Sequence, residues 1–570
     1  MKVKILKKMT LNERIDYLQP DIYRIFNDFT NEHVRVYNAF AKQYISNMFP
    51  KDKVKKWTND GYVIIAQTGT GKSTWVTRTI AEMLLEDRAT GLLITPRVAL
   101  TMQYKRELAK LYCPELLEEL TEQGIHKQHE YGPFDVYSLQ EFLSAAKVRA
   151  IKSKRYEFVI LDEVHAFVGD AAFNPFTEKI FRLLLQEAGR QAKRVYLTAT
   201  PEIILDEIAQ VEEEITPEFI PRYDSLGWPK PNIRLTIFRF ARDYGYVQPI
   251  FFQAEEEILG KMESLSGEKR GLIFVRSVKQ GLEWQAKLGD QRAVFMNAQN
   301  KRTEREDEFN ELLRYQKIDK QFLIVTRFMD VGVNVHDLQL KVVILFHAFP
   351  EDVVQMLGRK RVAGNEVVQL YIEIPSIGAL KQEVGKLENA EAEIGRNREL
   401  LKNRVIMGIS ELPHPFYMQM TGDKCCLGCN GFFERWIFYH KRFLISCLKG
   451  ADNENTFVKN FVRNLLLHLP GCKKPFFLDR PEVSDENVCE EVSKILKPLL
   501  GKELNREEMG KLSDQLLRIF GERRRSDQQG QIAIKKLNNG LKKYGLTYAV
   551  SNKSKEKKRG IWMIEEGISA

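Results

Sequence analysis

The sequence is poor in cysteine and has no long uncharged apolar stretch. Seven cysteines in 570 residues, unevenly spaced, are too few for a disulfide framework. No window approaches the roughly 18 apolar residues that a membrane-spanning helix needs. The basic start, Met1–Lys8, is not followed by an apolar run, so no secretion signal is expected. These absences exclude disulfide-rich secreted proteins and membrane-spanning proteins, and they predict a cytoplasmic protein with no membrane partner.

The remaining composition is that of a globular protein with an excess of positive charge. Hydrophobic residues make up 44% and charged residues 29% of the chain, which is ordinary for a globular protein. The length indicates about three domains. The net charge is +10, and 13 Lys or Arg stand against 5 Asp or Glu between Gln515 and Ala570. This local excess indicates a polyanionic partner, usually nucleic acid, with a solubilising tail as the alternative.

A glycine-rich segment, Ala66-Gln-Thr-Gly-Thr-Gly-Lys-Ser-Thr74, lies between two segments of regular structure. Tyr62–Ile65 predicts a buried strand of a parallel sheet, and Trp75–Leu85 predicts a helix with an apolar face. Strand, glycine loop and helix together predict a phosphate-binding loop, although Ala66 stands where the usual pattern begins with Gly. Lys72 is expected to reach the β- and γ-phosphates. The residues expected to bind the nucleotide are Gly69, Thr70, Gly71, Lys72, Ser73 and Thr74.

Two more apolar strands end in polar motifs. Phe158–Leu161 is followed by Asp162-Glu-Val-His165, about 90 residues after the glycine loop. Asp162 is expected to hold Mg²⁺ together with the Ser73 hydroxyl, and Glu163 to orient and deprotonate the attacking water. The third strand ends in Thr198-Ala-Thr-Pro201.

These three motifs together resemble those of superfamily 2 helicases of the DExH type, within the DEAD/DEAH-box helicase family. The resemblance covers roughly residues 58–375, with the motifs in family order. The further segments that resemble motifs Ia, Ib, IV, V and VI are Leu92–Leu100, Val136–Leu139, Gly271–Ser277, Leu323–Asn334 and Gln355–Arg361. The resemblance implies an α/β fold with two tandem RecA-like P-loop domains that bind ATP and Mg²⁺ in the cleft between them.

The same resemblance implies roles for residues outside the glycine loop. Gln355, Arg359 and Arg361 would act in catalysis with Glu163, and Gly332 would contact the nucleotide. The residues that would contact nucleic acid, or couple it to hydrolysis, are Arg97, Ser138, Thr198, Thr200, Arg276 and Thr326.

The motif that contains these arginines departs from the family pattern. Most members carry Q-x-x-G-R-x-x-R, whereas here Val362 holds the place of the second arginine and Arg361 falls one residue early. This spacing resembles that of viral origin-binding and mobile-element helicases. Either Arg361 serves as the second arginine finger or Arg359 works alone. A third interpretation is that the arginines form a solvated basic helix face.

Changes in composition along the chain predict five regions. Residues 1–57 are expected to be helical, because apolar residues in Asn31–Phe40 recur near helical spacing. The proline-rich stretch Ile220–Asn232 is interpreted as the linker between the RecA-like domains. The regions are a helical segment at 1–57, the RecA-like domains at 58–230 and 231–375, a helical arm with an aromatic-rich accessory region at 376–483, and a basic domain at 484–570.

The accessory region contains a heptad pattern of apolar residues and a pair of closely spaced cysteines. Leu380, Leu387, Ile394 and Leu401 recur every seven residues, which predicts a long amphipathic helix packed on its own chain. Cys426 and Cys429 have the spacing of half a zinc site. His440 and Cys447 are the candidates to complete that site, but free buried thiols are the favoured interpretation.

The basic domain resembles a winged-helix module. Helices precede a basic helix at Gln531–Tyr544, and two strands then flank a basic loop at Ser551–Gly560. In such modules a helix enters a groove of the nucleic acid while the hairpin tip touches phosphates. The lysines expected to make these contacts are Lys535, Lys536, Lys557 and Lys558.

The sequence therefore predicts an ATP-dependent superfamily 2 helicase or translocase. It is expected to act on DNA rather than RNA, with replication, recombination or repair proteins as partners. An RNA helicase is one alternative, and a site-specific DNA-binding protein with ATP as a switch, such as an origin-recognition protein, is another. A nuclease-associated motor is disfavoured, because the chain shows no nuclease cluster of carboxylates and lysine.

Overall fold

The computed structural model divides the chain into two compact units, Met1–Leu478 and Asp479–Ala570. The residues that it describes are 34–39, 44–119, 122–143, 151, 154–215, 222–223, 229–230, 234–300, 303–326, 335–346, 349–362, 366–402, 414–421, 424–451, 453–478, 485–519, 534–543, 546–551 and 562–566. Within these ranges no helix is both long and apolar enough to cross a membrane.

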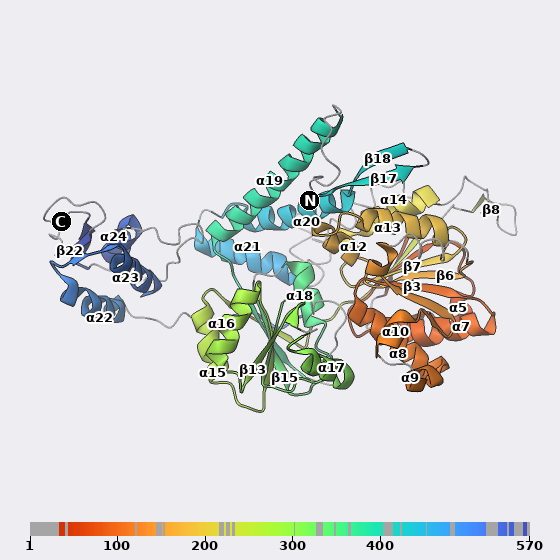
Figure 1. Ribbon diagram of the computed structural model, residues 1–570, viewed down its shortest axis with the longest axis horizontal. Coiled ribbons are helices and arrows are strands. Elements are labelled where there is room, and N and C mark those ends of the chain that lie inside the picture. Colours follow the sequence, from red (N-terminus) through yellow and green to blue (C-terminus); the bar gives the residue numbers. More distant parts are fainter. Residues whose placement is uncertain are drawn as a thin grey trace, which may run out of the picture. The chain divides into compact units, whose positions relative to one another are not determined.

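The first unit contains two parallel sheets, each flanked by helices (Figure 1). The first has eight strands in the order β1-β10-β2-β7-β6-β3-β5-β4, all paired in parallel except β4 with β5. Their bounds are β1 Val34–Ala39, β2 Gly61–Ile65, β3 Gly91–Thr95, β4 Glu130–Tyr131, β5 Phe134–Ser138, β6 Phe158–Leu161, β7 Lys193–Thr198 and β10 Leu235–Phe240.

The four central strands of this sheet are buried along their whole length, which explains why their sequences are apolar rather than alternating. Apolar helix faces cover both sides of the sheet and form two separate cores. The helical elements of this domain are α4 Ile45–Met48, α5 Lys51–Val54, α6 Lys72–Thr74, η1 Trp75–Ile80, α7 Ala81–Glu86, α8 Val98–Tyr112, α9 Pro114–Glu119, α10 Glu122–Lys127, η2 Leu139–Leu143, α12 Ala166–Gly169, η3 Asp170–Ala172, α13 Thr177–Leu184, η4 Leu185–Gly189, η5 Pro201–Ile203 and α14 Leu205–Ile215.

The helix expected at Asn31–Phe40 is wrong, because Val34–Ala39 forms the edge strand β1. It pairs in parallel with β10, from Val34 opposite Leu235 to Ala39 opposite Phe240. Val34 and Val36 are partly buried while the residues next to them are exposed, so the period is two. A short apolar run fits both the period of a helix and the period of a strand. Here the pairing with β10 makes it a strand.

Strand β10 also bears on the position of the domain boundary. It lies between β1 and β2 in the first sheet, whereas residues from 231 onward were assigned to the second domain. The first sheet thus takes a strand from beyond the expected linker. Most of that linker lies outside the described residues, apart from the short pair β8 Arg222–Tyr223 and β9 Pro229–Lys230.

The second sheet has seven strands in the order β13-β14-β12-β15-β16-β11-β19, all paired in parallel. Its edge strand β19 comes from the accessory region, more than 100 residues after the strand β16. The strands are β11 Val247–Phe252, β12 Arg270–Phe274, β13 Ala293–Met296, β14 Phe322–Val325, β15 Leu340–Leu345, β16 Val368–Glu373 and β19 Phe476–Phe477, and the helices are α15 Glu255–Glu263, α16 Val278–Leu288, α17 Glu306–Tyr315 and α18 Pro350–Leu357. The two sheets are those of tandem RecA-like domains, as predicted.

The accessory region is mainly helical. The expected amphipathic helix is α19, Ile377–Lys402, and its Leu380, Leu387 and Ile394 are buried. It packs on α20 of its own chain, as predicted (Figure 1). The other elements are a hairpin, β17 Phe416–Thr421 with β18 Lys424–Cys429, and the helices α20 Gly431–Leu448 and α21 Glu454–Leu466.

The second unit folds around a core of its own, which includes Leu516, Leu537 and Ile564. Its order is α22 Asp485–Leu496, η9 Lys497–Leu499, β20 Glu503–Leu504, α23 Arg506–Ile519, α24 Ile534–Lys543, β21 Tyr548–Ser551 and β22 Trp562–Glu566. The strands pair as β20-β22-β21, both pairs antiparallel. Three helices with a strand after the first and a hairpin at the end make an arrangement of the winged-helix type.

Candidate active site

The glycine-rich segment forms a tight loop between β2 and α6. Gly69 and Gly71 have φ angles of 85° and 81°, which only glycine adopts readily. The Thr70 hydroxyl donates to the Gln67 carbonyl at 2.8 Å. Lys72 is buried, and its Nζ donates to the Ala66 carbonyl at 3.0 Å, across the mouth of the loop. The loop therefore has the backbone conformation and the buried cation that a phosphate-binding loop requires.

Asp162 and Glu163 follow β6 directly and lie beside this loop. The Asp162 Oδ2 accepts a 2.8 Å hydrogen bond from the Tyr104 hydroxyl, which also interacts with Ser73. Tyr104 thus connects the two residues predicted to hold Mg²⁺. The Glu163 Oε1 lies 4.0 Å from the Lys72 Nζ.

The two carboxylates differ in their electrostatic surroundings. Burial, together with the charge of Glu163, raises the pKa of Asp162. Burial also acts to raise the pKa of Glu163, but the positive groups around it outweigh this and lower that pKa below its ordinary value. These positive groups are Lys72, His165, Arg359 and Arg361. Glu163 is therefore ionised at neutral pH, as a general base must be.

Magnesium fits the residues present at this position. Asp162 and Glu163 are 3% and 5% exposed, so two adjacent carboxylates carry negative charge where water cannot screen it. Carboxylate and hydroxyl oxygens are ligands that Mg²⁺ accepts, usually completed by substrate phosphates and water. Among the described residues no group of three or more His, Cys, Asp or Glu side chains could hold a metal ion.

The backbone at Glu163 is strained. Its φ is 47°, a left-handed conformation that is uncommon for a residue other than glycine. The turn follows the strand end at once, so it aims the Glu163 carboxylate back over the glycine loop. Such strain is typical of functional positions, where the surrounding structure enforces it.

A polar chain connects Glu163 to the Thr198-Ala-Thr-Pro201 motif. The Glu163 carboxylate lies 3.5 Å from the His165 Nδ1, which is 3.1 Å from the Thr198 hydroxyl. That hydroxyl accepts from the Thr200 amide at 3.0 Å. Thr198 and Thr200 are buried and are connected to Glu163 through His165.

The second RecA-like domain closes onto the glycine loop. The side chain of Gln67 exchanges two hydrogen bonds with the Asp243 backbone, at 3.1 and 2.9 Å. A Cβ added to Gly358 would lie 2.5 Å from the Thr68 hydroxyl. Only glycine therefore allows this approach, at the end of α18 where the two predicted arginines follow.

Both arginines lie near enough to Glu163 for their charges to lower its pKa. Helix α18 ends at Leu357, and Lys360 forms a parallel bridge with Val335. Lys360 turns away and donates to the Asp337 carbonyl at 2.7 Å, whereas Arg359 and Arg361 both act on the pKa of Glu163. In an extended segment, residues two apart share a face. A spacing of two can thus replace the usual helical spacing of three.

Arg359 and Arg361 differ in their burial and in the groups that they contact. Arg359 is 4% exposed, and its guanidinium donates to the carbonyl and side-chain oxygens of Gln355 at 3.0 and 3.2 Å. The Arg361 Nη1 would lie 3.6 Å from a Cβ at Gly69, directly beside the loop. Burial and the charge of Arg359 lower the pKa of Arg361 to about 10, so it remains charged at neutral pH. The interpretation of these residues as a solvated helix face is wrong, because Arg359 is buried, Arg361 is partly buried, and both follow the helix.

Several predicted nucleic-acid contacts are held by carboxylates of the same chain. Arg97 pairs with Asp170, and Arg276 pairs with Glu373. The amide and hydroxyl of Ser138 donate to the Glu141 carboxylate at 2.6 and 3.0 Å. Thr326 follows β14 and is partly buried. These residues lie at the carboxyl ends of strands, where ligands of such sheets bind.

Some predicted residues lie outside the described structure. Gly332 falls in the range 327–334, and Lys557 and Lys558 fall in the range 552–561, neither of which is described. Lys535 belongs to α24, but its side chain is not described. Lys536 is exposed on the same helix.

The candidate zinc ligands do not come together among the described side chains. Cys429 accepts a 3.6 Å contact from Arg398, His440 contacts the Trp436 carbonyl, and Cys447 is a buried free cysteine. The side chain of Cys426 is not described.

Sequence reasoning missed three residues of the site. Tyr104 and Tyr44 belong to no recognised motif here, and only the fold brings them to the loop, whereas Gln67 lies in the loop itself but had no predicted role. Tyr44 is 62% exposed, and its ring lies 3.4 Å from a Cβ at Gly71, at the rim of the loop. No spacing signal marks Tyr104, because its contact with Asp162 depends on how α8 packs.

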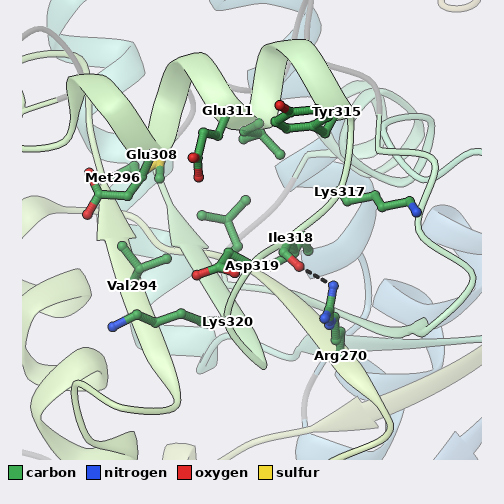
Figure 2. Close-up of a pocket in the computed structure, with 12 residues that line it drawn as sticks. Arg270, Val294, Met296, Glu308, Glu311, Tyr315, Lys317, Ile318, Asp319 and Lys320 are labelled. Carbon is green, nitrogen blue, oxygen red and sulfur yellow. Dashed lines mark hydrogen bonds between the residues drawn. The ribbon is translucent and has the colours of Figure 1, made fainter.

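A separate cavity of about 280 Å³ lies between α17 and the edge of the second sheet (Figure 2). It is lined by Arg270, Val294, Met296, Glu308, Glu311, Leu312, Tyr315, Lys317, Ile318, Asp319, Lys320 and Leu323. Arg270 and Lys320 lie at the amino ends of β12 and β14, opposite to the ends where ligands of such sheets bind. None of the predicted site residues lines it.

Comparison with known proteins supports a nucleotide-binding helicase domain in the first part of the chain. Residues 46–208 match the family model described as DEAD/DEAH box helicase, and no curated protein matches. The solved structures found include Mss116 bound to ssRNA and UDP-BeF, with TM-score 0.44 and 12% identity over 76% of this chain and 94% of that one. Saccharomyces cerevisiae Dbp5 bound to RNA and ADP-BeF₃ gives 0.42 and 11% over 77% and 89%. A Methanococcus jannaschii DEAD box protein gives 0.32 and 18% over 55% and 82%.

The structural similarities are too low to support any inference about substrate. The family match, by contrast, covers the glycine loop, the carboxylates and the Thr198-Ala-Thr-Pro201 motif. The chain is therefore an ATP-dependent helicase enzyme, and its residues 46–208 are similar to the DEAD/DEAH box helicase family.

Proposed function

We propose that this protein is an ATP-dependent translocase that moves along nucleic acid, with DNA as its substrate, and that it belongs to the DExH type. The observation that carries the proposal is the meeting of two half-sites. Lys72 and Glu163 of the first domain lie together, and the charges of Arg359 and Arg361 of the second domain lower the pKa of Glu163. The Arg361 Nη1 also lies beside Gly69 of the loop. Hydrolysis at such a site depends on both domains being in place, so each cycle can move one domain relative to the other.

The proposed roles follow from the positions of these groups. The glycine loop and Lys72 bind the phosphates of ATP. Glu163, ionised and placed by the turn after β6, takes a proton from the attacking water. Arg359 and Arg361 stabilise the charge that develops on the transferred phosphoryl group. Bound through Ser73 and Asp162, Mg²⁺ would add neutralisation of phosphate charge.

The coupling between nucleic acid and ATP is proposed to pass through Thr198 and Thr200. The Thr198 hydroxyl contacts His165, which contacts Glu163, and it accepts a hydrogen bond from the Thr200 amide. A change in the strand end at Thr198 would therefore shift the catalytic base. We propose that nucleic acid passes along Arg97, Ser138, Arg276 and Thr326. On binding, Arg97 and Arg276 would leave Asp170 and Glu373 and pair with phosphates instead.

The decisive experiment compares ATP hydrolysis with single-stranded DNA, duplex DNA and RNA, using full-length protein. Stimulation by DNA above RNA is expected, and Lys72→Ala gives the background, because it removes the cation at the phosphates. Turnover that survives Lys72→Ala in folded protein would exclude the assignment. Stimulation by RNA alone would make the protein an RNA helicase.

A second role, specific DNA binding switched by ATP, is favoured by the winged-helix arrangement of the second unit. Lys536 and Lys542 are exposed on α24, whereas Leu537 and Leu541 are buried in the unit's core. The Asn538 side chain exchanges hydrogen bonds of 3.0 and 2.8 Å with the Val550 backbone. The helix is thus fixed against the hairpin with its basic face outward. A footprint at one DNA sequence that needs this unit but not Lys72 would favour this role.

Removal of the second unit is expected to weaken DNA binding and its dependence on salt. Each lost phosphate contact should reduce the slope of log K against log salt by about 0.9 on duplex DNA, or about 0.7 on single strands. Because 13 Lys or Arg stand against 5 Asp or Glu between Gln515 and Ala570, within this unit, truncation after Leu478 should flatten the slope by several units. Titrations of both proteins at three salt concentrations measure this change.

Charge reversal tests the same prediction in the intact chain. Lys536→Glu with Lys542→Glu should lower the slope while Leu537 and Leu541 keep the core intact. Glu507→Lys with Lys511→Glu, which exchanges an exposed ion pair on α23, is the control without change of net charge. If truncation leaves affinity and slope unaltered, the basic tail serves solubility alone.

A further inference from the structure

Helix α20 of the accessory region is anchored on the first RecA-like domain by its first turn. The Asn430 Nδ2, at its N-cap, donates to the Asn174 carbonyl and to the Thr177 hydroxyl, each at 3.0 Å. The Gly431 amide donates to the Glu178 carboxylate at 2.6 Å. Several polar contacts of fixed direction therefore set where this helix begins.

The anchor continues along the next two turns. Phe432 is fully buried in a core of the first domain, with its ring centroid 5.5 Å from that of Phe181. The Arg435 guanidinium pairs with Asp206 and lies 3.6 Å from Glu207, both on α14. The first half of α20 therefore follows the first domain.

The second half of α20 packs on the second domain. Ile437, Leu444 and Cys447 belong to the core that also contains Val353 and Val354 of α18. His440, 1% exposed, points at the same helix, and its Nε2 lies 2.5 Å from the Glu351 Oε1. One helix thus contacts both domains, and its polar contact in the second is with the helix that precedes the arginines.

The His440 ring is held in one orientation. Its Nδ1 lies 2.7 Å from the Trp436 carbonyl oxygen, which can only accept a hydrogen bond, so this nitrogen carries a proton. The Phe349 ring meets it edge-on at 4.1 Å between centroids. The Nε2 is left facing the Glu351 carboxylate, 2.5 Å from its Oε1.

Glu351 lies one helical turn before Gln355, so both project from the same face of α18. Gln355 in turn receives the two hydrogen bonds from Arg359. A line of side chains along one face of α18 and the turn after it therefore leads from His440 past Glu351 and Gln355 to Arg359. Glu351 also sits in the first turn of α18, where a carboxylate favours the helix.

A second ion pair, between Glu202 and Arg242, lies near His468 of the accessory region. Glu202, which follows Thr200 and Pro201, pairs with Arg242 at 3.1 Å. His468 of the accessory region experiences the charges of Glu202, Arg242 and Glu351, and burial lowers its pKa. The accessory helices thus also contact the segment that follows the Thr198-Ala-Thr-Pro201 motif.

We propose that His440 is a positioning residue for ATP hydrolysis, through which α20 sets the second domain's arginine against the first domain's site. The contact with Glu351 holds α18, and therefore Arg359, at the position that the anchor of α20 on the first domain prescribes. The accessory region then regulates hydrolysis without touching the nucleotide. This inference rests on the proposed role of Arg359 in hydrolysis.

The test measures the kcat and KM for ATP of the full-length protein with stimulating nucleic acid present. His440→Ala should lower kcat by about 10- to 100-fold, because a misplaced group in the active site costs that much. The KM for ATP should stay within about two-fold, because the glycine loop is untouched. His440→Gln, whose amide can still donate to Glu351, should restore most of the kcat. Phe438→Ala, half-exposed on the same helix, is the matched control and should change neither constant.

A purely structural role predicts different results. In that case His440→Ala would lower the melting temperature but leave kcat per folded molecule unchanged, and His440→Gln would rescue nothing in the kinetics. In a double-mutant cycle, His440→Ala with Glu351→Ala should cost no more than the worse single variant; additive losses would overturn the proposal. If His440→Ala does not fold, Glu351→Ala against Glu351→Gln makes the same comparison from the other side.

Different results would overturn the proposed function and the positioning role of His440. Wild-type protein without Lys72-dependent turnover would overturn the proposed function itself. Turnover that depends on Lys72 and Arg359 but is indifferent to His440 would overturn only the positioning role.

Discussion

Replacement of Glu163 by Gln is expected to lower kcat for ATP hydrolysis by about 10²- to 10⁴-fold, the range for loss of a general base. The carboxylate is buried, and Lys72, His165 and the two arginines keep it ionised. An amide of the same shape cannot accept the proton of water. Asp162, the glycine loop and Lys72 remain, so ATP affinity should be retained. Single-turnover hydrolysis and binding of a fluorescent ATP analogue separate the two effects.

Two control variants sharpen this test. Glu157→Gln changes a carboxylate just before the same strand, paired with Lys193, and should leave kcat unchanged. Asp162→Asn should weaken the dependence of turnover on Mg²⁺ concentration, which Glu163→Gln should not. An unaltered kcat in Glu163→Gln would show that another group is the base.

The first half of this site could be predicted from sequence because its residues are consecutive. The glycine loop and Asp162-Glu163 each follow an apolar strand directly. Parallel strands of one sheet present their carboxyl ends at one edge, so their convergence follows from topology. The structure brings Lys72 and Glu163 within 4.0 Å, as that argument requires.

Contacts set by packing could not be predicted in this way. Tyr104 reaches Asp162 from α8 across 58 positions of sequence, and His440 reaches Glu351 across about 90. Neither pair has a fixed spacing that a pattern can encode. The strand β1 was missed for a related reason, because its partner β10 lies about 200 residues away and decides the period that a short apolar run leaves open.

The sequence does not decide whether Arg361 acts as the second arginine finger. The family pattern places the two arginines three residues apart, whereas Arg359 and Arg361 are two apart. The structure shows why the standard need not apply: α18 ends at Leu357, Gly358 and Arg359 form a turn, and Lys360, between the two arginines, forms a bridge with Val335. The departure from the pattern is therefore a change of local structure and not a missing residue.

Both arginines are accordingly expected to act in hydrolysis, but unequally. Arg359→Ala should lower kcat by roughly 10³-fold or more, the value of an arginine finger. It also leaves the Gln355 side chain, part of the line from His440, without its partner guanidinium. Arg361→Ala should also lower kcat and should raise the KM for ATP, because the Arg361 guanidinium lies beside Gly69 of the loop.

Lysine replacements distinguish charge from geometry at the two positions. Arg361→Lys should keep much of the kcat, because a point charge beside the phosphates suffices. Arg359→Lys should not, because one ammonium cannot make both hydrogen bonds to Gln355 while facing the nucleotide. Arg314→Ala, exposed on α17 of the same domain, is the matched control. If Arg361→Ala has wild-type kcat and KM, Arg359 acts alone, and the extended segment after α18 serves only to join the two domains.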